Sequence, residues 1–213
     1  MKKRVVASLI ILLIMLSLSS CTIPIIGDFI ESEESLGKTN NTAVAIADAM
    51  KDYLKNKKKD DAALYGVELI LNSDGNGTVR LYYSEKAPKD AAYSDVLVAE
   101  VDSKTGHVSR FSAANYAKDG LAPYQLVKEC HAFDAGTLPI DSEKAISLGV
   151  RSFSNDLEFH YDYVQILLSA PYGMEQYEVD FISMLNDKVY RCTVDAVSGN
   201  VLAVSSGELV KEG

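Results

Sequence analysis

The side chains that most often do chemistry are few in this sequence and lie far apart. Its three histidines are His107, His131 and His160, and it contains no H-E-x-x-H motif, C-x-x-C motif or glycine-rich phosphate loop. Cys130 precedes His131 and could be considered as a nucleophile beside its base. Adjacent residues of a helix point about 100° apart, however, and a catalytic pair normally meets through the fold. We therefore expect no catalytic residue, no cofactor and no metal site.

Two charged clusters each have a binding and a structural interpretation. Asp156, Glu158 and Asp162 lie near His160 and could gather a cation, but the solvated beginning of a strand explains them equally well. The lysines at 55 and 57–59 close an expected helix, where positive charge favours the C-terminal dipole; binding to an acidic polymer is the alternative. Neither cluster assembles an acid, a base and a nucleophile, so a hydrolase ranks behind the binding functions.

Cys21 is the residue whose surroundings predict a covalent modification. A basic start at 2–4 precedes an apolar run over 5–16 and the small residues 17–20. This order indicates a signal peptide over 1–20; a retained membrane span is the alternative, although a bilayer core needs about 20 residues. The sequence Leu-Ser-Ser-Cys ending at Cys21 resembles the bacterial lipobox. We expect a lipoprotein held on the bacterial cell membrane by lipid at this cysteine, facing outside the cytoplasm.

The composition limits the partners of the chain. Its 213 residues are 47% apolar and carry a net charge of −9, with a pI near 4.8. An apolar fraction of this size excludes wholesale disorder, and the acidic balance excludes a nucleic-acid partner, which needs a surplus of Lys and Arg. Residues 21–41 indicate a tether, within which the apolar patch 23–30 could instead form a short edge strand or lie on the domain.

Two cysteines remain once Cys21 is lipidated. An even number in an exported chain makes a disulfide between Cys130 and Cys192 plausible, joining the linker to the second half. Both positions also have the apolar surroundings of buried free thiols. The sequence leaves these two states open.

Most of the remaining chain consists of one sequence pattern that occurs twice. The segment 42–53 aligns with 142–153 at an offset of 100, and the matching apolar positions fall on one helical stripe. Thr42 begins the first helix, and either Ser142 or Asp141 caps the second. A second match, at an offset of 93, places Val-Asp-x-x-Thr-Gly-x-Val at 101–108 over Val-Asp-x-x-Ser-Gly-x-Val at 194–201.

Strand signals lie between the helix and the turn in each copy. They cover 65–71, 79–83 and 95–101 in the first copy, and 161–168, 177–182 and 189–194 in the second. We therefore predict an α+β fold of two tandem units, each a helix packed on a three- to four-stranded antiparallel sheet. Alternation predicts which side chains are buried under the helices: Leu97, Ala99 and Val101, and Tyr190, Cys192 and Val194.

The repeated turn has a structural interpretation. Asp102 and Asp195 can accept backbone N–H bonds, while Gly106 and Gly199 suit positive φ. A metal site is the weaker interpretation, because neither aspartate has a second acid or histidine at ligand spacing.

These features together resemble the PepSY family. The resemblance rests on the helix, the Tyr-x-Val strand at 177–179, and the Val-Asp-x-x-(Thr/Ser)-Gly-x-Val ending in both copies. The first copy departs from the pattern, with Val-Arg-Leu at 79–81 and an extra loop at 86–92. The corresponding organisation is two PepSY-like repeats at 42–113 and 141–207, a linker with a short helix from about 123 to 133 within 114–140, and a tail at 208–213. The resemblance implies cystatin-like units that bind or restrain peptidases, with no catalytic residue.

Two functions follow. The preferred one is a non-catalytic, membrane-anchored module that binds an envelope protein, such as a peptidase or a cell-wall hydrolase. The alternative is a lipoprotein that binds a small ligand or cell-wall fragment in a cleft between the repeats. Its candidate contacts are six tyrosines, most of which also suit strand positions where the ring is buried and the hydroxyl reaches solvent. They are Tyr65, Tyr82, Tyr83, Tyr161, Tyr163 and Tyr172.

Overall fold

The computed structural model describes residues 35–36, 42–72 and 74–209. The expected signal peptide, Cys21 and nearly all of the tether lie outside the described residues, as does the end of the tail. Within the described part of the chain, no helix is both long enough and apolar enough to span a bilayer.

Helices and strands follow each other in nearly the same order in the two halves. The first half runs through α3 (Ala43–Asn56), β1 (Ala63–Asn72), β2 (Gly77–Ser84), the 3₁₀ turn η1 (Tyr93–Asp95), β3 (Val96–Asp102) and β4 (Val108–Ala113). The second half runs through α6 (Ser142–Ser152), β5 (Tyr163–Ser169), β6 (Gln176–Ser183), β7 (Lys188–Asp195) and β8 (Val201–Glu208). Between them lie α4 (Tyr116–Asp119), α5 (Ala122–Glu129) and the 3₁₀ turn η2 (Ala135–Thr137).

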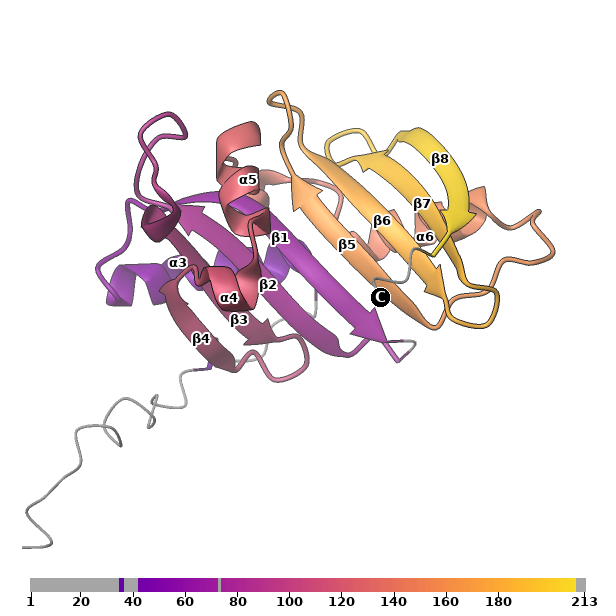
Figure 1. Cartoon of the computed structure of the whole chain (residues 1–213), viewed down its shortest axis with the longest axis horizontal. Helices are drawn as coiled ribbons and strands as arrows, with labels where there is room; N and C mark the ends of the chain where they lie inside the picture. Colours follow the sequence, from indigo (N-terminus) through magenta and orange to yellow (C-terminus); the bar gives the residue numbers. More distant parts are fainter. Residues whose placement is uncertain (1–34, 37–41, 73, 210–213) are drawn as a thin grey trace, which may run out of the picture. The chain divides into compact units, whose positions relative to one another are not determined.

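All eight strands join in one antiparallel sheet, in the order β4-β3-β2-β1-β5-β6-β7-β8 (Figure 1). The α+β class is therefore confirmed. Strands β1 and β5 pair over seven residues, from Gly66 opposite Ser169 to Asn72 opposite Tyr163. The repeat predicted two separate sheets, but the structure joins them into one. The first strand of each half, β1 or β5, would otherwise be an open edge, and each strand covers the other.

Helices α3 and α6 pack on one face of this sheet, over the main core. Ile46 and Met50 of α3 and Ala145 of α6 are fully buried there. The strand side chains predicted to lie beneath the helices do so: Ala99, Val101, Tyr190, Cys192 and Val194 are fully buried in this cluster, and Leu97 packs against it. Period-2 alternation was sufficient to find this face because the strands are regular.

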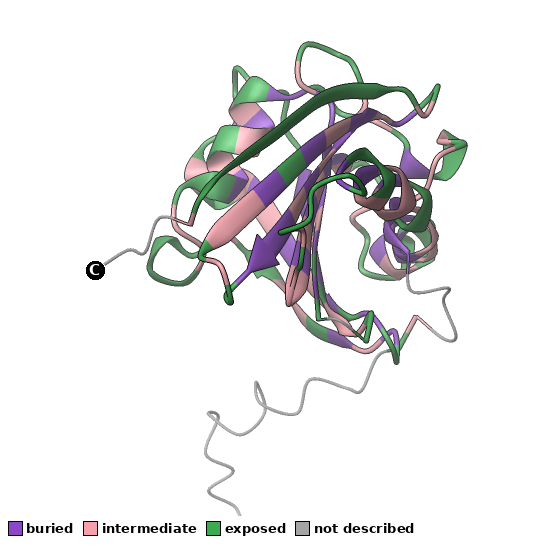
Figure 2. Ribbon diagram, turned by 90° about the vertical axis from the view of Figure 1, so that its right-hand side faces the viewer, coloured by how far each residue is buried: buried purple, intermediate pink, exposed green. Residues whose placement is uncertain are grey.

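The opposite face of the first half is also covered, which alternation did not predict. Helix α5 packs against β1, β2 and β3, and its Val127 joins a second cluster with Tyr65 and Val96. Val96 and Val98 are therefore fully buried on the face opposite α3 and α6. Figure 2 shows helices on both sides of the sheet. The linker helix ends at Glu129 instead of near 133, and the chain then continues in extended form.

The first turns of α3 and α6 are tied to each other. Ser142 Oγ accepts a hydrogen bond from Ala43 N at 3.0 Å, and Asp141 Oδ1 accepts one from Val44 N at 3.2 Å. Asp141 also caps its own helix by accepting from Ser142 N. Backbone N–H groups at a helix start lack helical partners, so this exchange satisfies donors that would otherwise be buried without any.

The two repeated turns have the same hydrogen bonds. Asp102 Oδ1 accepts from Thr105 N at 2.7 Å, and Asp195 Oδ1 accepts from Ser198 N at 2.6 Å. Gly106 and Gly199 both have positive φ, 68° and 74°. The hydrogen bonds from Thr105 and from Ser198 lower the pKa of Asp102 and Asp195, respectively.

These lowered pKa values predict a loss of stability in acid. A carboxylate with a lower pKa in the folded state stabilises the fold above its unfolded pKa of about 3.9, and the contribution disappears as the pH falls through the folded value. We expect the urea midpoint to be level between about pH 6 and 5 and to fall below about pH 4. The Asp102→Asn, Asp195→Asn double variant should start lower at pH 6 and fall less. An equal fall in both proteins would assign the acid sensitivity to other carboxylates.

Candidate functional site

The residues first considered for chemistry do not come together. Cys130 ends α5 and is buried, and burial raises the pKa of its thiol. His131 is exposed beside it, and its backbone N–H bonds to Ala170 O. Glu158 forms an ion pair with Lys188, and His160 Nε2 lies 3.4 Å from Asp162 Oδ1, so these side chains have local partners. Among the described residues, no three His, Cys, Asp or Glu side chains are placed to hold a metal ion.

Cys130 and Cys192 are free, buried thiols in this structure. Cys192 lies in the core beneath α6, whereas Cys130 follows α5, which packs on the other face of the sheet. The disulfide considered from the sequence is therefore not formed, because the sheet separates the two sulfur atoms. Of the two states that the sequence left open, the structure has the buried free thiols.

The two edges of the sheet differ in how well they are protected. At the β4 edge, Arg110 makes a bidentate ion pair with Asp119 of α4, with both N–O distances at 2.7 Å. Ser35 forms a β-bridge with His107, and Leu36 N donates to Gly106 O at 2.8 Å. Charged side chains and added chain are usual protections of an edge strand. This edge is accordingly a poor site for a further strand.

The β8 edge has neither protection within the described residues. Every residue of this strand is exposed (Figure 2), including Val201, Leu202 and Val204. Val197 in the preceding turn is also exposed, and we call these four residues the β8 apolar edge. Glu208 is the only charged residue of the strand, and it lies at the far end. A long edge strand with unprotected backbone and apolar side chains is a template for strand addition.

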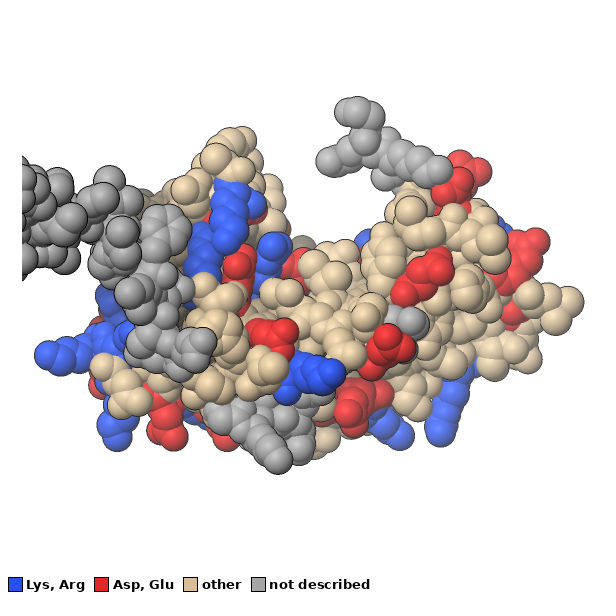
Figure 3. Space-filling model, turned by 90° about the horizontal axis from the view of Figure 1, so that it is seen from below, with Lys and Arg blue, Asp and Glu red and all other residues tan. Residues whose placement is uncertain are grey.

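The sheet face on the α5 side is polar beyond α5. Tyr82 Oη donates to Glu68 at 2.6 Å, Gln165 Nε2 donates to the same carboxylate at 2.8 Å, and Arg191 pairs with Asp180. The surface is hollowed between the side that carries α4 and α5 and the side that carries β8 (Figure 3). These polar groups already have hydrogen-bond or ion-pair partners within the chain. The open face therefore offers a binding protein its shape rather than unpaired charges.

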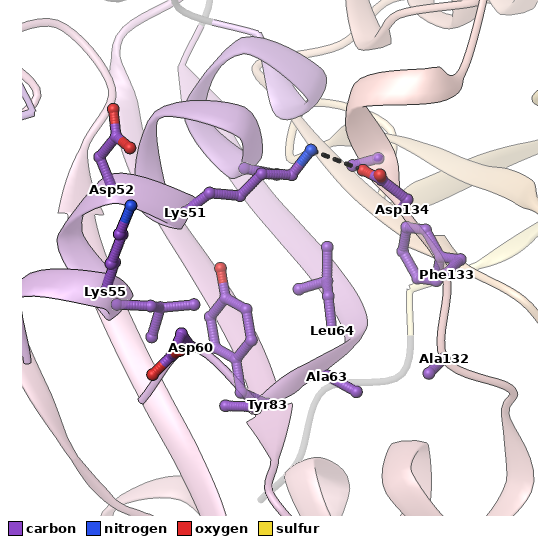
Figure 4. Close-up of a pocket in the computed structure, with 14 residues that line it drawn as sticks. Lys51, Asp52, Lys55, Asp60, Ala63, Leu64, Tyr83, Ala132, Phe133 and Asp134 are labelled. Carbon is purple, nitrogen blue, oxygen red and sulfur yellow. Dashed lines mark ion pairs between the residues drawn. The ribbon is translucent and has the colours of Figure 1, made fainter. Parts of the chain in front are cut away.

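A cavity of about 580 Å³ lies on the other face of the sheet, in the first half. Its walls come from α3, from the beginning of β1, from the end of β2 and from the chain after α5, which we call the 132–135 segment. Tyr83, at the end of β2, lines it together with Leu54, Leu64 and Phe133 (Figure 4). Its mouth carries charges of both signs, on Lys55, Asp52 and Asp60 among others.

The six tyrosines proposed as ligand contacts do not share a site. Tyr83 lines the cavity, but Tyr82 and Tyr65 lie on the opposite face. Tyr161 packs in an aromatic cluster with Phe159 and Phe181. Strands β1 and β5 pair along the junction of the halves, where the sequence placed a cleft. The cavity depends on the 132–135 segment, whose position no local sequence pattern indicates.

The fold defines the chain as an α+β protein with one eight-stranded antiparallel sheet. No family model matches the sequence, and no curated protein matches it either. A solved structure of a candidate lipoprotein from Clostridium difficile 630 is similar, with 11% identity and a TM-score of 0.46, over 83% of this chain and 100% of that one. A likeness at that level identifies neither a family nor a function for this chain.

Proposed function

We propose that this chain is a non-catalytic lipoprotein of the bacterial envelope that binds a partner protein by accepting one of its strands at β8. The β8 apolar edge carries this proposal. Among residues 35–36, 42–72 and 74–209, it is the end of the sheet with free backbone and apolar side chains, whereas ion pairs and a bridging segment occupy the β4 edge. Strand addition gains affinity from main-chain hydrogen bonds and specificity from alternate side chains.

The partner in this proposal is an extended segment of an envelope peptidase or cell-wall hydrolase. A partner strand with small apolar side chains at alternate positions would cover Val201 and Val204, which are 41% and 52% exposed. Occupying such a segment would restrain the enzyme that carries it. The chain would be held near this enzyme by lipid at Cys21, as the lipobox-like sequence predicts, because acyl chains concentrate a protein at the membrane surface.

The finer proposal is that the two halves are tandem PepSY-like repeats. Its support is the matching strand order on either side of the β1–β5 junction and the matching hydrogen bonds of Asp102 and Asp195. The alignment also pairs Thr42 with Ser142, and both are buried where the two helices begin. Duplicated units that share one sheet would leave their outer strands, β4 and β8, as the two edges.

The test uses as bait the chain from residue 21 onward with Cys21→Ser, which lacks both the apolar run 5–16 and the acyl anchor and should appear outside the membrane fraction. The bait is incubated with native envelope extract, and retained peptidases and cell-wall hydrolases are quantified by mass spectrometry. Val204→Asp should reduce capture roughly tenfold, equal to about 1.4 kcal/mol, because it places a charge where an apolar side chain of the partner would dock.

The matched control is Ser112→Asp, which adds the same charge to the β4 edge. Aspartate there keeps an acceptor for Arg110 Nε, which bonds to Ser112 Oγ at 2.9 Å. This variant should capture as much as the bait, and circular dichroism should show both variants folded. Equal capture by Val204→Asp and the bait would refute docking at β8. A mature parent chain whose mass carries no acyl groups would refute the lipid anchor.

A further inference from the structure

The β8 edge stays open whenever no partner strand is bound to it. Strand β8 ends the sheet, all of its residues are exposed, and no further strand of the described residues pairs with it. An uncovered edge strand is a template for pairing with another chain, and native proteins therefore protect such edges. The edge is thus open to a strand of another molecule even before the partner protein arrives.

The free side of β8 is regular over most of its length. Residues 203–208 pair with β7 without a break, and the register shift of this pair lies nearer the start of the strand. Leu209 N donates to Asp187 O across the same strand pair. Backbone direction alternates along a strand, so the N–H and C=O groups at 204, 206 and 208 point away from β7. These outward groups can pair with a straight antiparallel strand.

The charges beside this edge are balanced within the chain. The net charge of −9 makes two copies repel each other over most of their surfaces. Glu208 lies opposite Lys188 of β7, however, and Arg191 of β7 pairs with Asp180 at 2.6 Å. The rest of β8 is uncharged. A second copy can therefore approach closely along β8, whereas the β4 edge presents charged side chains.

We propose that β8 pairs with β8 of a second copy of this chain, antiparallel and centred on Val204, and that a partner strand must displace this copy. This regulatory role rests on the proposed function, because it occupies the same edge. Antiparallel pairing of a strand with its own copy creates a two-fold axis, so both copies use the same residues. The two Val204 side chains meet on the α6 face, because Val204 lies opposite the buried Cys192. The two Glu208 carboxylates stay at the outer ends of the ladder.

The size of this contact predicts a weak dimer. A single strand pair buries less than the roughly 1,200 Å² that is usual in stable complexes, so the two copies should exchange readily. Lipid at Cys21 would hold the copies at one membrane surface and raise their effective concentration there. A weak dimer protects the edge and still yields to a partner strand whose side chains fit it better.

Sedimentation equilibrium of the Cys21→Ser chain from residue 21 onward tests the self-pairing. The protein should form dimers at up to millimolar concentration and nothing larger, because pairing uses the edge of both copies. Val204→Asp should weaken the dimer at least about tenfold, because it places two like charges opposite each other. Ser112→Asp, at the β4 edge, is the matched control and should dimerise as the parent chain does.

Crosslinking of Val204→Cys tests the register. The two Cα atoms at 204 should be about 5.5 Å apart, within the range of a disulfide. Mild oxidation should therefore join two copies at least about ten times faster than in the control Ser112→Cys, which places an exposed thiol on the other edge strand. Cys130 and Cys192 are buried, so they do not compete for the crosslink.

Three results would overturn the self-pairing. They are a chain that stays monomeric, a dimer that Val204→Asp does not weaken, and equal crosslinking of Val204→Cys and Ser112→Cys. A monomeric chain whose capture of envelope enzymes still falls in Val204→Asp would leave the proposed function standing alone.

The crosslinked Val204→Cys dimer separates the two roles of the edge. It should capture fewer peptidases and cell-wall hydrolases than the same protein after reduction, because its edge is permanently occupied. Full capture by the crosslinked dimer would refute partner docking at β8 and the displacement step, and it would leave the dimer itself intact.

Discussion

Gly149→Leu is expected to lower the free energy of unfolding by about 3 kcal/mol, at the upper end of the usual cost of overpacking a core. A Cβ atom at position 149 would lie 2.5 Å from Cε2 and 2.7 Å from Cζ of Phe181, well inside contact distance. Leucine is the better helix former, by less than about 1 kcal/mol, so the steric effect decides the sign. Urea unfolding followed by circular dichroism measures the change.

Phe181 cannot easily move aside. It is fully buried, and its ring makes edge contacts with Phe159 and Tyr161 at centroid distances of 5.5 and 5.1 Å. Its strand is also paired on both sides, with Val164 of β5 and Tyr190 of β7 opposite it. Since the core is close-packed, any shift of the ring moves several neighbours. The absence of a side chain at 149 is therefore what lets α6 approach the sheet.

The control for this variant comes from the sequence repeat. Ala49 occupies the equivalent position in α3 and is only partly buried, so Ala49→Leu should change stability by no more than about 0.5 kcal/mol. Combining Gly149→Leu with Phe181→Ala should cost less than the two single changes together, by at least about 1 kcal/mol, because the second removes the clash of the first. Additive costs, or a Gly149→Leu chain as stable as the parent, would show that α6 relaxes freely.

Local patterns were sufficient to predict α3, α6, six of the eight strands and one face of the sheet, but not the outer strands β4 and β8. The apolar stripe of residues 42–53 gave a helix that the structure places at Ala43–Asn56, and alternation put Ala99 and Val101 in the core. These features depend on neighbours a few residues apart. The repeated Asp-x-x-(Thr/Ser)-Gly turns could be found for the same reason.

Pairings between distant segments could not be predicted in this way. Nothing near Leu69 or Ile166 indicates that they face each other across the β1–β5 junction. Each strand would have the same apolar residues whether it paired with the other half or ended a separate sheet. The sequence predicts the α5 helix, but the apolar face of this helix does not say which surface it covers, so its position over Val96 could not be predicted. The cavity was missed because Tyr83 and Phe133 meet only after both placements.

The junction predicts that the two halves unfold together. Ile166 of β5 is fully buried and lies opposite Leu69 of β1 and Val179 of β6. Ile166→Ala should lower the free energy of unfolding by about 2–5 kcal/mol through lost burial and the cavity left behind. Because one sheet passes through both halves, the loss should spread to all of it. Hydrogen exchange should show faster exchange of the slowest amides in β2 and in β6 alike.

Leu167→Ala is the matched control, because Leu167 is the next residue of β5, points to the open face and is only partly buried. It should cost clearly less than Ile166→Ala while touching the same strand pair. A single unfolding transition at unchanged slope in urea would accompany both variants. If Ile166→Ala instead speeds exchange in β6 and β7 and leaves β2 and β3 protected, each half has its own stability and β1–β5 pairing is a weak contact. Loss of protection throughout would mean that strain applied at the β8 edge by a bound strand can reach the first half through the same sheet.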